Sequence, residues 1–154
     1  MKDLTKKEIK KLQTNLSLIR KLAGWSTAEL GDRIGVTKQT IGNLENGKSE
    51  MTKTQYIAIR AVIDYEIGNN EDTEALSKVV SVLLDSENLS DEDQEKIEDT
   101  MAFVSGAADR GLDKQKLISG MTTLLAGVGI AASIIGAATS TKAGLYPWMK
   151  KIIK

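Results

Sequence analysis

Residues 37–45 combine apolar and polar side chains at helical spacing. Ile41 and Leu44 lie on one face of the expected helix, and the opposite face carries side chains that can donate or accept hydrogen bonds: Lys38, Gln39, Thr40 and Asn43. The side-chain amides of Gln39 and Asn43 can each pair bidentately with adenine. A lysine can donate to guanine O6 or N7, and a threonine offers a hydroxyl and a methyl group. Gly42 adds no bulk to this face. We therefore expect the outer face of this helix to be a polar surface that can contact base edges.

A second set of residues flanks this helix and suits contacts to phosphate. Its members are a threonine at the start of the preceding helix, a threonine at the start of this helix and three residues beyond its end: Thr27, Thr37, Asn46, Gly47 and Lys48. Helix N-termini attract anions through free N–H groups, and such contacts position a protein on a nucleic acid.

The elements that must hold these side chains are two short helices joined by a tight turn. Ser26 with Glu29 predicts a capped helix start, and Gly35 supplies the positive φ of a turn. Thr37 can cap the second helix, and Asn46-Gly47 ends it. Gly31 is small where the two helices approach each other. Apolar residues stand where crossing helices need them: Leu30, Ile34, Val36, Ile41 and Leu44.

At these residues the chain resembles the lambda-repressor-like (Xre) family of helix-turn-helix proteins, over about residues 9–67. The matching segments are 25–30 (Trp-Ser-Thr-Ala-Glu-Leu), 35–41 (Gly-Val-Thr-Lys-Gln-Thr-Ile) and 44–48 (Leu-Glu-Asn-Gly-Lys). The resemblance implies a unit of up to five helices whose helix from Thr37 enters the DNA major groove. It also implies a dimer on two half-sites about one helical turn apart.

The resemblance also assigns roles to residues outside the recognition surface. The family often pairs a glutamate at the position of Glu45 with an arginine on the first helix, where this chain has Arg20. We expect a structural ion pair between them instead of base reading by Glu45. Trp25 stands where the family has an apolar core residue, so we expect it to be buried.

The composition excludes most catalytic chemistry. The chain has no Cys and no His, which removes disulfides, thiolate zinc sites, cysteine nucleophiles and the commonest general base. No cluster of residues suggests catalysis, a metal site or a cofactor. No apolar run follows Met1, so a secretory signal is not expected and a cytoplasmic protein is. We expect a binding protein and not an enzyme.

The whole chain is expected to be all-α, in three regions of different charge. Residues 1–68 form the helix-turn-helix region, with a first helix behind a capping box of Thr5 and Glu8 and a fourth opened by Thr52 and Gln55. Residues 69–113 form an acidic linker of two helices, the second opened by Ser90 and Asp93, with a joint flanked by Gly106 and Gly111. The outer faces of this linker are either solvated, or they dock a basic partner or the basic residues 1–60, which hold 12 Lys and Arg against 6 Asp and Glu.

Residues 114–154 contain an uncharged stretch and a basic aromatic tail. No residue from Leu117 to Thr141 is charged, and as a helix these 25 residues would be about 37 Å long. That is enough to cross a bilayer, with Tyr146 and Trp148 at the interface. Two alternatives stay open: a buried oligomerisation helix in a soluble protein, and an anchor that lies on the membrane surface.

Two functions follow from these features. The first is a sequence-specific transcription regulator that binds double-stranded DNA as a homodimer and is tethered to the membrane through residues 117–141. The second is a membrane-anchored adaptor whose helix-turn-helix binds a protein partner. The polar, non-acidic surface of Lys38, Gln39 and Asn43 favours the first.

Overall fold

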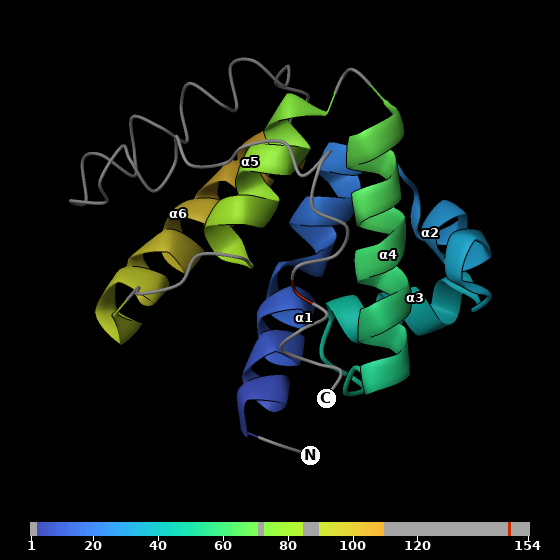
Figure 1. Ribbon diagram of the computed structural model, residues 1–154, viewed down its shortest axis with the longest axis horizontal. Coiled ribbons are helices and arrows are strands. Elements are labelled where there is room, and N and C mark those ends of the chain that lie inside the picture. Colours follow the sequence, from blue (N-terminus) through green and yellow to red (C-terminus); the bar gives the residue numbers. More distant parts are fainter. Residues whose placement is uncertain (1–2, 71–72, 85–89, 110–147, 149–154) are drawn as a thin grey trace.

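The computed structural model describes residues 3–70, 73–84, 90–109 and 148, and those residues form helices, turns and short connections (Figure 1). The helices are α1 (Asp3–Ala23), α2 (Thr27–Ile34), α3 (Lys38–Glu45), α4 (Lys53–Asn69), α5 (Glu74–Leu83) and α6 (Asp91–Asp109). Helix α1 lies in the middle, with α5 and α6 packed on one side and α3 and α4 on the other. The all-α prediction agrees with this part of the chain.

The local signals around α2 and α3 give the expected structure. The Ser26 side chain accepts a hydrogen bond from the backbone N–H of Glu29, and the Glu29 carboxylate accepts one from the backbone N–H of Ser26. Gly35 ends α2 with φ 78°, a conformation that favours glycine. The Thr37 hydroxyl accepts from the N–H of Thr40 and so caps α3. The two predicted caps and the predicted turn are confirmed.

The start of α1 differs from the prediction. Thr5 and Glu8 do not form a capping box at its N-terminus, because the helix already begins at Asp3. Both side chains are buried within the helix, and Glu8 lies 3.5 Å from the ammonium group of Lys11. The helix therefore starts two residues before Thr5, and Thr5 and Glu8 face the protein interior instead of capping a helix end. The helix ends at Ala23, and Gly24 directly after it has φ 81°.

Four helices, not five, form between residues 3 and 70, all of which the structure describes. Thr52 and Gln55 cap α4 as predicted, and α4 then runs unbroken to Asn69. The next helix, α5, begins only at Glu74. The core between α1, α3 and α4 contains fully buried side chains from each helix: Leu12, Leu16, Ile19, Ile41, Leu44, Tyr56, Ile59 and Ile63.

Helices α5 and α6 both contact α1. Leu76, Val79 and Leu83 of α5 and Ile97 of α6 are buried in the same apolar cluster as the core of α1. Asp93 N–H donates to the hydroxyl of Ser90, as the predicted helix start requires. Helix α6 continues through Gly106 and ends at Asp109, and the rest of the joint predicted between Gly106 and Gly111 lies outside the described residues.

The predicted uncharged segment, Leu117 to Thr141, lies outside the described residues. None of the helices that the structure does describe is long and apolar enough to span a membrane. Trp148 is described, and its position corrects the prediction of a membrane-interface residue: its side chain is buried, and its indole N–H donates to Asp64 on α4.

Candidate nucleic-acid interface

Helix α3 presents its polar side chains away from the core. Ile41 and Leu44 are at most 1% exposed, while Lys38 and Gln39 are exposed and Thr40 and Asn43 are half-buried. The Gln39 amide donates a 3.2 Å hydrogen bond to the Asn43 side-chain oxygen, one helical turn later. The structure thus brings the four predicted base-contacting residues onto one face.

The beginning of α3 holds two threonines in contact with each other. The hydroxyl oxygens of Thr37 and Thr40 lie 3.0 Å apart, and Thr37 also caps the helix. Capping fixes Thr37 at the N-terminal end of α3, where helix N–H groups favour an anion. Thr27, the first residue of α2, is half-buried.

The turn after α3 carries the remaining predicted phosphate contacts. Asn46, Gly47 and Lys48 are all exposed. Gly47 adopts φ 78°, and the Asn46 side-chain oxygen accepts from the N–H of Lys48 at 3.1 Å. This arrangement gives the turn a defined shape and holds the backbone of Lys48 just beyond the C-terminal end of α3, opposite from Thr37.

Gln13 of α1 is a residue that the sequence analysis missed. Its side-chain amide nitrogen donates to the carbonyl oxygens of Leu44 at 3.0 Å and Ser49 at 2.7 Å, and its oxygen accepts from the N–H of Met51 at 2.9 Å. One side chain therefore ties both ends of the loop between α3 and α4 to α1. Gln13 also lines a groove of about 650 Å³ between this loop and the N-terminal half of α1.

We expect Gln13→Ala to lower the free energy of unfolding by about 1–2 kcal/mol, because it leaves three backbone groups of the loop without this partner. The matched control is Thr14→Ala, at an exposed neighbouring position of α1, which should change stability by less than about 0.5 kcal/mol. Thermal unfolding followed by circular dichroism measures both. Equal melting temperatures for the two variants would show that Gln13 does not hold the loop.

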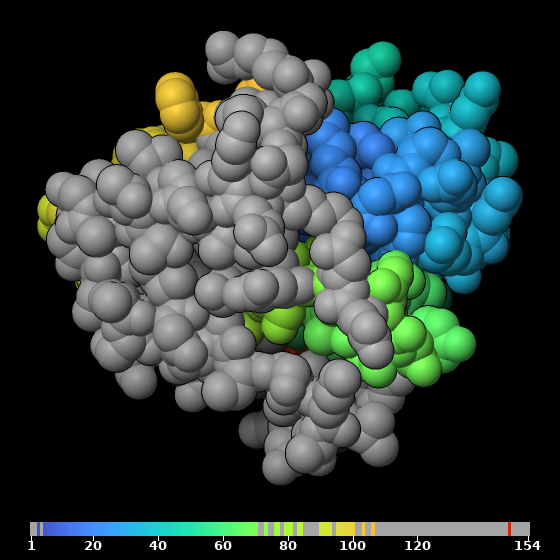
Figure 2. Space-filling model, turned by 90° about the horizontal axis from the view of Figure 1, so that it is seen from above, coloured from blue at the N-terminus to red at the C-terminus, as the bar shows by residue number. Residues whose placement is uncertain are grey.

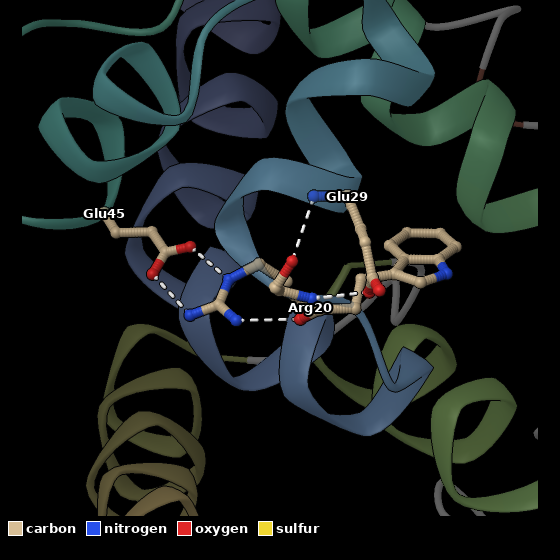
Figure 3. Close-up of polar contacts among 5 residues, drawn as sticks. Arg20, Glu29 and Glu45 are labelled. Carbon is tan, nitrogen blue, oxygen red and sulfur yellow. Dashed lines mark hydrogen bonds and ion pairs between the residues drawn. The ribbon is translucent and has the colours of Figure 1, made fainter.

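The expected ion pair between Arg20 and Glu45 is present and fixes α3 to α1 (Figure 3). The guanidinium Nε and Nη2 atoms donate to the two carboxylate oxygens at 2.6 and 2.9 Å, and Nη1 donates to the carbonyl oxygen of Trp25 at 2.8 Å. The two side chains are only 11% and 12% exposed. Both carboxylate oxygens of Glu45 are therefore used in the contact that joins α3 to α1.

Trp25 is buried, as predicted, in the connection between α1 and α2. The guanidinium carbon of Arg33 lies 4.6 Å from the centre of its ring, so the last turn of α2 packs on the indole. Seen from above, α1 and α2 form a continuous surface beside the C-terminal end of α4 (Figure 2). These contacts fix α2, and through it the turn that leads into α3.

Comparison with known proteins agrees with this geometry. Residues 16–68 match a family described as helix-turn-helix, and this range contains α2, α3 and most of α4. No curated protein and no solved structure matches the chain. A match to this family supports a DNA-binding regulator in general. Residues 16–68 thus form a helix-turn-helix domain of the lambda-repressor-like (Xre) type.

Proposed function

We propose that this protein is a sequence-specific, dimeric DNA-binding transcription regulator that acts in the cytoplasm. The observation that carries the proposal is the outer face of α3, where two amides, a lysine and a threonine are grouped on a helix whose other face is buried. A helix of this kind fits the major groove, and its side chains match the base edges there.

The contacts of the free protein support a division of roles. The hydrogen bond between Gln39 and Asn43 keeps both amides on the outer face of α3, where each can exchange its partner for an adenine. Thr27 and Thr37 at helix N-termini, and Asn46, Gly47 and Lys48 in the turn after α3, are proposed to contact the phosphates on either side.

Two substitutions separate base reading from phosphate binding. We expect Gln39→Ala to weaken binding to the cognate site by about 1–3 kcal/mol and to relax the preference for one base pair. Lys48→Ala should weaken binding to every sequence and reduce the slope of log K against log salt by about 1. Equilibrium titration of labelled duplexes at several salt concentrations measures both effects.

The control for charge is Lys96→Ala on α6, which removes one positive charge on the other side of α1 from α3. Lys96 is 40% exposed and lies 3.2 Å from Glu92. Its replacement should leave the salt slope unchanged. A loss of binding for Lys96→Ala equal to that for Lys48→Ala would mean that only net charge matters.

Selection of random duplexes with the full chain tests the proposal itself. We expect one motif to be enriched at moderate salt, with two related half-sites one helical turn apart if the protein binds as a dimer. No enrichment by a folded protein would overturn DNA reading and favour the adaptor function, in which the helix-turn-helix binds a protein. A single half-site would overturn the dimer alone.

Membrane attachment by residues 117–141 is separable from DNA binding. The absence of charge over these 25 residues supports membrane attachment. A single crossing between α6 and Trp148, however, would separate Trp148 from α4, to which its indole N–H donates. We therefore propose that the tail lies on the same side as the DNA-binding domain. Carbonate extraction of membranes tests this, since retention of the full chain in the membrane pellet would indicate a span and overturn the proposal.

A further inference from the structure

Three side chains of α4 contact the indole ring of Trp148. Tyr56, Arg60 and Asp64 follow each other at a spacing of four residues, so they form one stripe along the helix. Trp148 lies 84 positions beyond Asp64 in the sequence and is only 3% exposed. The contact therefore joins two distant parts of the chain.

Each residue of the stripe contacts the indole in a different way. The rings of Tyr56 and Trp148 meet edge to face, with centres 5.7 Å apart and planes at 85°. The guanidinium carbon of Arg60 lies 5.2 Å from the centre of the indole ring. The carboxylate of Asp64 accepts the indole N–H at 2.6 Å. Ring contacts alone would accept any aromatic side chain, whereas the Asp64 carboxylate requires a donor that phenylalanine lacks.

We propose that this stripe of α4 is a docking site for a tryptophan side chain, and that its occupant is Trp148 of the same chain. Because site and ligand belong to one chain, docking is an intramolecular step that weak contacts can sustain. Docking attaches the C-terminal tail to the helix-turn-helix domain. It also covers Tyr56 and Arg60, so a dimer must use another surface. The proposal does not depend on DNA binding.

Fluorine NMR of the full chain labelled with 5-fluorotryptophan tests this docking. The protein has two tryptophans, Trp25 and Trp148, and the spectrum of Trp148→Phe identifies their signals. The shift of each signal between H₂O and D₂O reports exposure to solvent. We expect a small solvent shift for Trp148 in the unmodified chain and a several-fold larger one in Asp64→Leu, which removes the acceptor.

Two matched variants test whether the hydrogen-bond acceptor at position 64 keeps Trp148 protected from solvent. Asp64→Asn keeps a carbonyl oxygen and should keep Trp148 protected. Glu66→Leu removes an acidic side chain from another face of α4, where Glu66 accepts from Asn70, and should also keep Trp148 protected. The Trp25 signal should stay constant in all variants, because Trp25 is buried against Arg33 and reports that the domain is folded.

The outcomes that would overturn the proposal are distinct. Exposure of Trp148 in the unmodified chain, or continued protection in Asp64→Leu, would show that the stripe is not its docking site. Loss of protection on tenfold dilution would show that the site is filled by a second copy of the chain. Neither result depends on whether the protein binds DNA.

Discussion

Gly31→Ala is expected to lower the free energy of unfolding by about 3 kcal/mol. An ideal Cβ at this position would lie 2.6 Å from the carbonyl oxygen of Val36 and 3.2 Å from the carbonyl carbon of Thr37. Both are backbone atoms of the turn between α2 and α3, and the Val36 N–H is itself held by the Gly31 carbonyl oxygen at 2.9 Å. The turn cannot move away from the added methyl group without losing this hydrogen bond.

Gly42→Ala is the matched control and should have the opposite sign. Apart from the neighbouring backbone of α3 itself, no atom lies within 4 Å of an ideal Cβ at Gly42, and the residue is inside α3. Alanine there should stabilise the protein by about 0.5–1 kcal/mol, because glycine is the poorer helix former. Thermal unfolding of the two variants measures the difference. A stable Gly31→Ala protein would contradict the close packing of α2 against the start of α3.

Glu45→Ala is expected to cost about 2–3 kcal/mol of stability, because it leaves the Arg20 guanidinium without its main partner. Breaking a fully buried pair costs about 3–5 kcal/mol, and the slight exposure of this pair reduces that value. The substitution should lower the melting temperature by about 4–12 °C, since each kcal/mol corresponds to about 2–4 °C for a chain of this size.

Glu50→Ala controls for the removal of an acidic charge near the same loop. Glu50 is exposed and lines the groove beside α1, so its replacement should change stability by less than about 0.5 kcal/mol. Differential scanning calorimetry of both variants makes the comparison. An unchanged melting temperature for Glu45→Ala, together with an altered preference among DNA sequences, would indicate that Glu45 contacts bases instead.

The sequence was most informative where structure depends on neighbouring residues. The caps at Ser26, Thr37 and Thr52 and the left-handed turn at Gly35 are decided within four residues, and each is present as predicted. The polar face of α3 likewise follows from helical spacing. The end of α1 directly before Gly24 obeys the same local chemistry but was not predicted.

Predictions failed where distant contacts decide the structure. Thr5 and Glu8 are buried inside α1, which begins before them, and nothing in their own neighbourhood reveals that burial. Gln13 contacts residues 31 to 38 positions away, so its role in holding the loop has no signal in its own neighbourhood. The uncharged stretch before Trp148 predicts a membrane-interface position for this residue, whereas Trp148 contacts Tyr56, Arg60 and Asp64 of α4.

The central claim is that the outer face of α3 reads DNA sequence, and the ratio of two dissociation constants tests it most directly. The full chain is titrated with its selected duplex and with a scrambled duplex of the same length, at one salt concentration. We predict at least about 10³-fold tighter binding to the selected duplex, and a ratio about 5- to 150-fold smaller for Gln39→Ala, equivalent to 1–3 kcal/mol. Equal dissociation constants for the two duplexes, or a ratio that Gln39→Ala leaves unchanged, would contradict the claim.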